Sequence, residues 1–167
     1  MREADLPLVE RWLLEPHVRH WWDEAEPAYP ERTLAGYRAA IRGEDPTLMF
    51  LIAMDGRPIG LIQTYRISDH PEYAAALDCG FEAAGVDLFI GEPELVHQGH
   101  GPRLLRAFVR EMVFDRYDVD ECVVGPSVDN AAAIRAYEKA GFSHWRDAVV
   151  PGEPAPERLM RITRAEV

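Results

Sequence analysis

The stretch that decides the fold begins as VDLFI at Val86–Ile90 and continues, after a short connection, as HQGHGP at His97–Pro102. The first segment is typical of a short apolar strand. The second opens a helix, because proline suits a first helical turn, in which its missing N–H would be unpaired anyway. Glycines between a strand and a helix let backbone N–H groups approach an anion, which the positive end of the helix favours. Gly99 and Gly101 therefore indicate either an anion cradle or a plain strand-to-helix turn.

A second informative stretch, NAAAIRAYEKAGF, runs from Asn130 to Phe142. Its composition predicts a helix with Asn130 as its N-cap and Gly141 as the residue that ends it. The helix carries one tyrosine, Tyr137. This side chain is either a core aromatic residue or a group that donates a proton.

Amphipathic and alternating patterns predict the remaining helices and strands. Their order, helices followed by a hairpin and then β-α-β-α-β-β, predicts an α/β fold of α+β layers on a mixed sheet. At 167 residues the chain is expected to form a single domain, residues 1–167. The predicted helices are residues 5–14, a helix capped by Thr33, Pro102–Tyr117 and Asn130–Ala140; the predicted strands are Leu48–Met54, Pro58–Tyr65, Val86–Ile90, Glu121–Gly125, Phe142–Val150 and Arg158–Thr163.

Three expectations concern the surroundings of these elements. Residues 68–85 are expected to form a loop. The helix that starts at Pro102 should bury a stripe made of Leu104, Leu105, Phe108, Met112 and Val113. A group of acidic residues should be mostly solvated, with one or two of them open to a role in a cleft: Asp45, Glu72, Glu82, Glu92, Glu94 and Asp129.

The formal net charge of −11 argues against a nucleic-acid-binding surface, because phosphate contact relies on clustered lysine and arginine. The same charge would favour small cationic partners, although it also simply promotes solubility. Cys79 and Cys122 make no disulfide framework. No apolar stretch approaches membrane-spanning length, so we expect no membrane partner and a cytoplasmic location.

Together, the strand, the glycine loop and the tyrosine helix resemble the acetyl-coenzyme A site of the GNAT acyltransferase superfamily. The resemblance implies a mixed, mostly antiparallel central sheet with helices on both faces. It also implies acetyl-coenzyme A as co-substrate and Tyr137 as the residue that protonates the thiolate leaving group. No metal is expected, because His97 and His100 lack a third ligand and are better interpreted as solvated loop residues.

More closely, the chain resembles the aminoglycoside 6'-N-acetyltransferases over nearly its whole length. The matching pieces, beside the glycine loop and the tyrosine helix, are Glu15–Val18, Trp21-Trp22, Gly85–Asp87 and Pro126-Ser127. The resemblance implies that Asp87 binds the reacting amino group and helps to remove its proton. It implies that Trp21 or Trp22 walls the acceptor pocket, with core packing as the alternative. The implied cofactor-binding residues are Phe89, Ile90, Gln98, Gly99, His100, Gly101, Arg103, Asn130 and Ala133.

The implied activity is acetyl transfer to a primary amine of a small cationic acceptor, with the 6'-amino group of an aminoglycoside as the expected target. The alternatives are an acyltransferase for siderophore-precursor hydroxylamines or other small amines, and a non-catalytic coenzyme A-binding module. Asp87 favours an amine, since the hydroxylamine branch usually has histidine there. Gly125 departs from the pattern of enzymes that place an antibiotic-contacting aspartate before Pro126-Ser127. The chain is expected to be a monomer or a homodimer.

Overall fold

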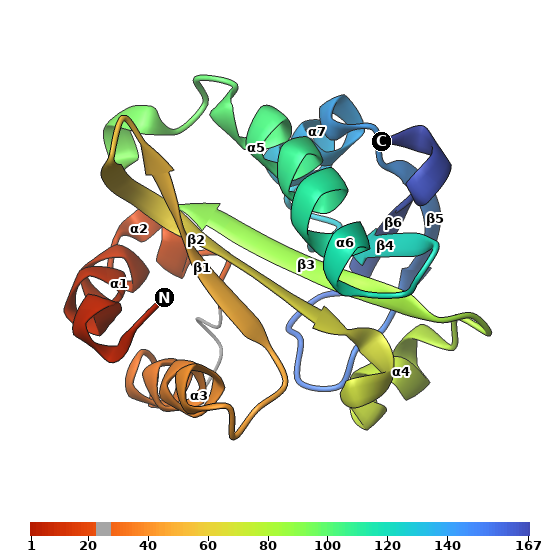
Figure 1. Ribbon diagram of the computed structural model, residues 1–167, viewed down its shortest axis with the longest axis horizontal. Helices are drawn as coiled ribbons and strands as arrows, with labels where there is room; N and C mark the ends of the chain where they lie inside the picture. The colour runs from red at the N-terminus through yellow and green to blue at the C-terminus, as the bar shows by residue number, and fades with distance from the viewer. Residues whose placement is uncertain (23–27) are drawn as a thin grey trace. The chain divides into compact units, whose positions relative to one another are not determined.

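The computed structural model describes residues 1–22 and 28–167 and contains a six-stranded sheet in the order β1-β2-β3-β4-β6-β5 (Figure 1). The strands are β1 (Leu48–Met54), β2 (Arg57–Arg66), β3 (Ala83–Ile90), β4 (Glu121–Val124), β5 (Ser143–Ala148) and β6 (Glu157–Thr163). The helices are α1 (Leu6–Leu13), α2 (Pro16–Arg19), α3 (Glu31–Arg42), α4 (Pro71–Leu77), α5 (His100–Phe108), α6 (Phe114–Arg116) and α7 (Ala131–Ala140).

The sheet is mixed, and the chain order explains why. β3 pairs parallel with β4, from Ala83 opposite Glu121 to Gly85 opposite Val123. A parallel pair needs a crossover connection, which here contains α5 and α6. β4 and β5 both pair antiparallel with β6. The predicted α/β fold with a mixed, mostly antiparallel sheet flanked by helices is thus confirmed.

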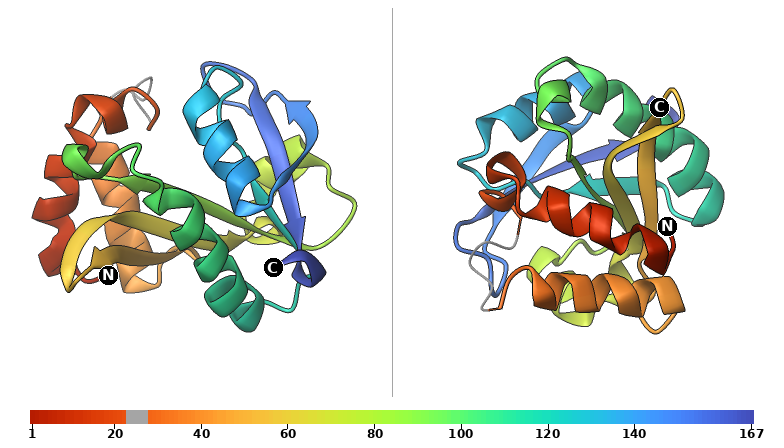
Figure 2. Two further views of the ribbon diagram at one scale, coloured as in Figure 1. Left: turned by 90° about the horizontal axis from the view of Figure 1, so that it is seen from above. Right: turned by 90° about the vertical axis from the view of Figure 1, so that its left-hand side faces the viewer.

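The chain divides into two compact units. The first unit contains Met1–Gln63 and Leu88–Gln98, and the second contains Thr64–Asp87 and Gly99–Val167. In the first unit, α1 and α3 run side by side (Figure 2) and bury their apolar faces in one core with residues of β1, β2 and β3. The buried members are Leu6, Val9, Trp12, Leu13, Val18, Leu34, Tyr37, Met49, Leu61 and Phe89.

In the second unit, α5 packs against α7, and α4 contributes Leu77 to a separate core cluster. Helix α4 corrects the expectation of a loop over residues 68–85. It begins at Pro71, where proline is tolerated at a helix start, and ends at Asp78 in the left-handed region, with φ of 43°. Leu77 is fully buried, so tertiary packing stabilises a helix too short to be stable alone.

The helix expected over 102–117 is interrupted by a π turn at Val109–Val113, between α5 and α6. The wider turn rotates the residues that follow it relative to a regular 3.6-residue repeat. Val109 and Val113 are buried as a result, whereas Met112 is 41% exposed. The prediction that Met112 belongs to the buried stripe is therefore wrong.

Helix α3 starts earlier than expected. Its N-cap is Pro30, and Thr33 lies buried inside its first turn instead of capping it. The predicted hairpin between β1 and β2 is correct, since Asp55 and Gly56 both have positive φ, as tight hairpin turns require. Among the described residues, no helix is long and apolar enough to cross a membrane.

Candidate active site

Asp87 lies on β3, half-buried among aromatic residues of the second unit. Burial, and then the charge of Asp87, raise the pKa of Tyr65 well above its usual value, and the Tyr65 hydroxyl hydrogen-bonds to the Asp87 carboxylate. Tyr65 lies there because residue 85 is glycine: a β-carbon on Gly85 would stand 2.4 Å from Tyr65 Cε2. Asp87 is therefore a carboxylate held by a specific partner, and not a solvent-facing strand residue.

A second carboxylate, Glu157 at the start of β6, lies in the same electrostatic network. The Tyr73 hydroxyl donates a hydrogen bond of 3.2 Å to Glu157 Oε2. The rings of Tyr65 and Tyr73 meet edge to face, with centroids 6.1 Å apart. Burial, followed by the negative charge of Asp87, raises the pKa of Glu157 to about 8. At neutral pH Glu157 is consequently mostly protonated, because two carboxylates in a partly dry environment resist ionising together.

Tyr137, on α7, is influenced by both carboxylates. Burial, and then the charges of Asp87 and Glu157, raise the pKa of Tyr137 well above its usual value. Its ring also packs near Phe142, with centroids 6.1 Å apart. The hydroxyl therefore keeps its proton at neutral pH and is able to donate a hydrogen bond.

Cys122, on β4, is fully buried, and burial raises the pKa of its thiol far above the usual range. The nucleophilic form of cysteine is the thiolate, which this environment disfavours. Cys122 is therefore a small apolar core residue rather than a covalent catalyst, as its sequence surroundings indicate.

Sequence reasoning singled out Asp87 and Tyr137 but missed Tyr65, Tyr73 and Glu157. The missed residues come from β2, α4 and β6, and only pairing of these elements with the rest of the second unit brings them near Asp87. Gly85 was the one available signal, since a glycine within a strand often marks the close approach of another group.

The glycine loop leads directly into α5. Gly99 is the N-cap in the left-handed region, with φ of 79°, and His100 is the first helical residue. A β-carbon on Gly99 or Gly101 would meet no atom of the described chain within 4 Å. The backbone at the start of α5 is therefore open to approach, as an anion cradle requires. Arg103 is exposed one turn into the helix.

Asn130 has the local role that its helix position predicts. Its side chain accepts a hydrogen bond of 3.0 Å from the backbone N–H of Ala133 and so caps α7. Gly141 ends the helix with φ of 102°. The amide oxygen of Asn130 is thus already used within the protein, while a cofactor contact by Asn130 or Ala133 remains a prediction.

Five predicted binding residues lie in the first unit: Trp21, Trp22, Phe89, Ile90 and Gln98, whose side-chain amide donates a hydrogen bond to the Glu94 carbonyl. Trp22 donates a hydrogen bond of 2.6 Å to the Tyr37 hydroxyl, and its ring meets Phe89 edge to face at 4.9 Å. These contacts favour core packing for Trp22, and the Phe89 side chain is itself buried. Trp21 is 44% exposed and so is the tryptophan that remains accessible. The Ile90 carbonyl accepts a 2.9 Å hydrogen bond from His17 Nε2.

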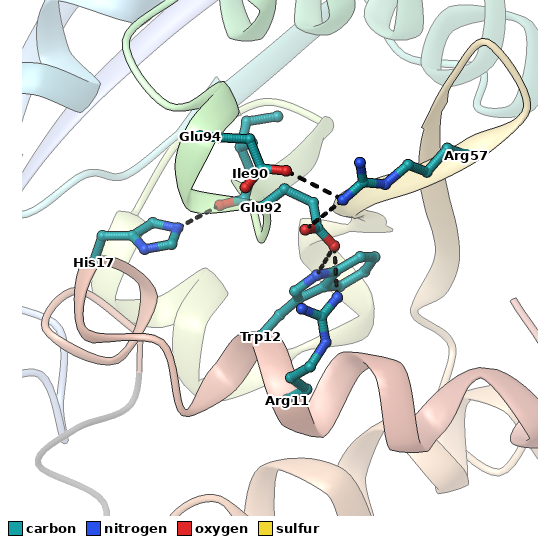
Figure 3. A network of polar contacts seen from close by, with 7 residues as sticks. All are labelled: Arg11, Trp12, His17, Arg57, Ile90, Glu92 and Glu94. Atoms are coloured by element: carbon teal, nitrogen blue, oxygen red, sulfur yellow. Dashed lines mark hydrogen bonds and ion pairs between the residues drawn. The ribbon is translucent and has the colours of Figure 1, made fainter.

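Glu92 corrects the expectation of a solvated charge, since it is only 4% exposed (Figure 3). Trp12 Nε1 and Arg11 bond to its Oε1 at 2.9 and 2.6 Å, and Arg57 bonds to its Oε2 at 2.8 Å. The Trp12 hydrogen bond is the main cause that lowers the pKa of Glu92. Because these three partners hold the buried Glu92 carboxylate within the first unit, Glu92 is a structural residue there.

Within residues 1–22 and 28–167, no group of three or more histidine, cysteine, aspartate or glutamate side chains is arranged to hold a metal ion. The carboxylates and hydroxyls around Asp87 are suited to acid–base chemistry, and the open start of α5 has the geometry that favours an anion.

The chain belongs to the GNAT acetyltransferase family, whose domain model matches residues 2–149. It is 30% identical over 159 residues to an aminoglycoside N(6')-acetyltransferase type 1 from Klebsiella pneumoniae, covering 93% of this chain and 77% of that protein. It is 24% identical over 135 residues to an N-hydroxyputrescine acetyltransferase from Acinetobacter baumannii, covering 81% of this chain and 60% of that protein.

Among solved structures, it is similar to aminoglycoside acetyltransferase AAC(6')-Ib in complex with coenzyme A and kanamycin. The TM-score is 0.82 at 29% identity, over 99% of this chain and 93% of that chain. The predictions of a GNAT fold, an acyltransferase and acetyl-coenzyme A as co-substrate are thus confirmed.

Proposed function

We propose that this protein transfers an acetyl group from acetyl-coenzyme A to the 6'-amine of an aminoglycoside. The observation that carries the proposal is that the Asp87 carboxylate, which Tyr65 holds by a hydrogen bond, lies near enough to Tyr137 for its charge to raise the pKa of the Tyr137 hydroxyl. Similarity to enzymes that acetylate aminoglycosides at N6' supports the choice of acceptor. We further propose that the enzyme works in the cytoplasm.

Asp87 acts on the acceptor amine. A primary amine is mostly an ammonium ion at neutral pH, and it has no lone pair for attack until it loses a proton. In the proposed role, the Asp87 carboxylate binds this ammonium and receives its proton. The Tyr65 hydroxyl fixes the orientation of the carboxylate during this step.

Tyr137 acts on the leaving group. Bound acetyl-coenzyme A supplies the reactive acetyl thioester. The Tyr137 hydroxyl, which is protonated at neutral pH, donates its proton toward the departing sulfur.

The residues at the start of α5 fit a coenzyme pyrophosphate. Gly99 and Gly101 carry no side chains, and the space beside them is open in the described chain. The helix start offers unpaired N–H groups and the positive end of the helix dipole. Gln98, His100 and Arg103 would surround the phosphates, with Arg103 adding positive charge.

A hydroxylamine acceptor is the alternative, favoured by the similarity to an N-hydroxyputrescine acetyltransferase. A thiol-release assay with kanamycin, a 6'-hydroxyl analogue of kanamycin and N-hydroxyputrescine separates the two activities. We expect turnover with kanamycin and none at the 6' position of the hydroxyl analogue. Turnover with N-hydroxyputrescine alone would establish the alternative.

In the same assay, Asp87→Asn should lose most activity, because an amide cannot accept the proton.

A further inference from the structure

In the second unit, the Glu157 carboxylate occupies the space that a side chain at position 125 would need. A β-carbon on Gly125 would lie 2.1 Å from Glu157 Oε2 and 2.8 Å from its Cδ. Real β-carbons do not approach other atoms this closely. No side chain therefore fits at position 125 while the Glu157 carboxylate keeps its place. The carboxylate fills the space into which a side chain at 125 would extend.

The backbone around both residues is fixed by pairing. Ser127 forms an isolated antiparallel bridge with Glu157, and the Arg158 N–H donates a 2.7 Å hydrogen bond to the Pro126 carbonyl. The Tyr73 hydroxyl then orients Glu157 Oε2. The start of β6 thus delivers an oriented carboxylate to the end of β4.

The chemistry proposed for Asp87 and Tyr137 does not use this carboxylate, although it lies within their electrostatic reach. The neighbouring cation on β6, Arg158, is directed to Asp147 at 3.3 Å. Tyr73 supplies Glu157 with a neutral hydroxyl donor. The free Glu157 carboxyl is mostly protonated at neutral pH, and a cation brought by a substrate would favour its ionised form.

We propose that Glu157 is a specificity-determining residue of the acceptor site, where its carboxylate binds a second ammonium of a polyamine while Asp87 holds the reacting one. This inference rests on the proposed function and deepens it, because it names charge at two positions as the property by which acceptors are selected. An acceptor with one amine gains nothing from Glu157, whereas a polyamine gains a charge-assisted hydrogen bond.

The test compares kanamycin with 6-amino-6-deoxyglucose, an acceptor with a single amine, in wild-type protein and Glu157→Gln. The amide keeps the shape of Glu157 and its contact with Tyr73 but has no charge. We expect kcat/KM for kanamycin to fall roughly ten- to a hundredfold through KM, as for loss of a charged hydrogen bond. Values for the monoamine and for acetyl-coenzyme A should change less than about twofold. Equal loss for both acceptors, or no loss for either, would overturn the proposal.

A second pair of variants tests the shared volume directly. Glu157→Ala removes the carboxylate and vacates its space, and Gly125→Asp in that background returns a carboxylate from β4. We expect the double variant to regain most of the preference for kanamycin. Circular dichroism checks that the double variant is folded. If the folded double variant shows the same preference for kanamycin as Glu157→Ala, a carboxylate at position 125 does not bind the same ammonium and the inference fails.

If the proposed function is wrong, the wild-type protein itself will show no turnover with kanamycin, whatever the variants do. Calorimetric titration of kanamycin in the presence of coenzyme A then still tests Glu157. Equal affinity in wild-type protein and Glu157→Gln would refute its role, and weaker binding by the variant would support it.

Discussion

The ring of Tyr65 occupies the space that a β-carbon on Gly85 would need, at 2.4 Å from Cε2 and 2.5 Å from Cζ. Gly85 and Asp87 are two residues apart on β3, so they face the same side of the strand. The missing side chain at 85 therefore lets the Tyr65 ring lie close to β3, where its hydroxyl reaches the Asp87 carboxylate.

Tyr65→Phe should lower kcat about three- to thirtyfold, because the ring still fills its place but no longer orients the Asp87 carboxylate. The KM for acetyl-coenzyme A should not change. Steady-state kinetics on a circular-dichroism-verified protein measures both. Tyr29→Phe is the matched control, since it removes a hydroxyl that donates to the Leu13 carbonyl in the first unit. Equal kcat in wild-type protein and Tyr65→Phe would show that Asp87 needs no such support.

Tyr137→Phe should reduce kcat roughly ten- to a thousandfold with little change in KM, because the hydroxyl is required only as the carbon–sulfur bond breaks. Single-turnover measurements with saturating acceptor report the chemical step itself. The phenylalanine variant retains the packing of the ring near Phe142, so its stability should match that of the wild type. A variant with a normal single-turnover rate would place Tyr137 among the core residues.

Gly101→Val should weaken binding of acetyl-coenzyme A, because a branched side chain would block the approach of phosphates to the backbone at the start of α5. The protein itself has room for the new β-carbon, which would meet no atom of the described chain within 4 Å. Isothermal titration calorimetry measures the affinity, with Gly36→Ala on α3 as a control outside the loop. Unchanged affinity in folded Gly101→Val would rule out the cradle.

The free energy of unfolding should depend on pH through Glu157. Three titratable residues influence this side chain: Asp87 on β3, Tyr73 on α4 and Glu153 in the loop before β6. The pKa of Glu157 is about 8 in the folded protein against 4.5 for an ordinary glutamate, so the folded state binds the proton more tightly. Unfolding free energy should therefore fall as pH rises from about 4.5 to about 8, by on the order of 4–5 kcal/mol at most.

Glu157→Gln removes this titration, so its stability curve should be flatter across the same pH range. Urea unfolding of both proteins at several pH values provides the comparison. Parallel curves for the two proteins would mean that Glu157 titrates normally. Saturating kanamycin should also reduce the wild-type slope, because a bound ammonium favours the ionised carboxylate.

The sequence by itself determined the local features of this protein. Strand β3, the glycine loop, the capped helix α7 and the hairpin at Asp55-Gly56 follow from signals within a few residues of each other. The identity of the family followed as well, because its motifs are carried by these local segments.

Only the tertiary structure decided how residues distant in the chain share space and charge. Tyr65, Tyr73 and Glu157 are ordinary residues of a strand, a helix and a strand end until folding places them beside Asp87. Glu92 likewise looked solvated, because Arg11 and Trp12, which surround it, lie some eighty positions away. Periodicity predicts which face of an element is buried, but a carboxylate's partners and proton affinity depend on its neighbours in three dimensions.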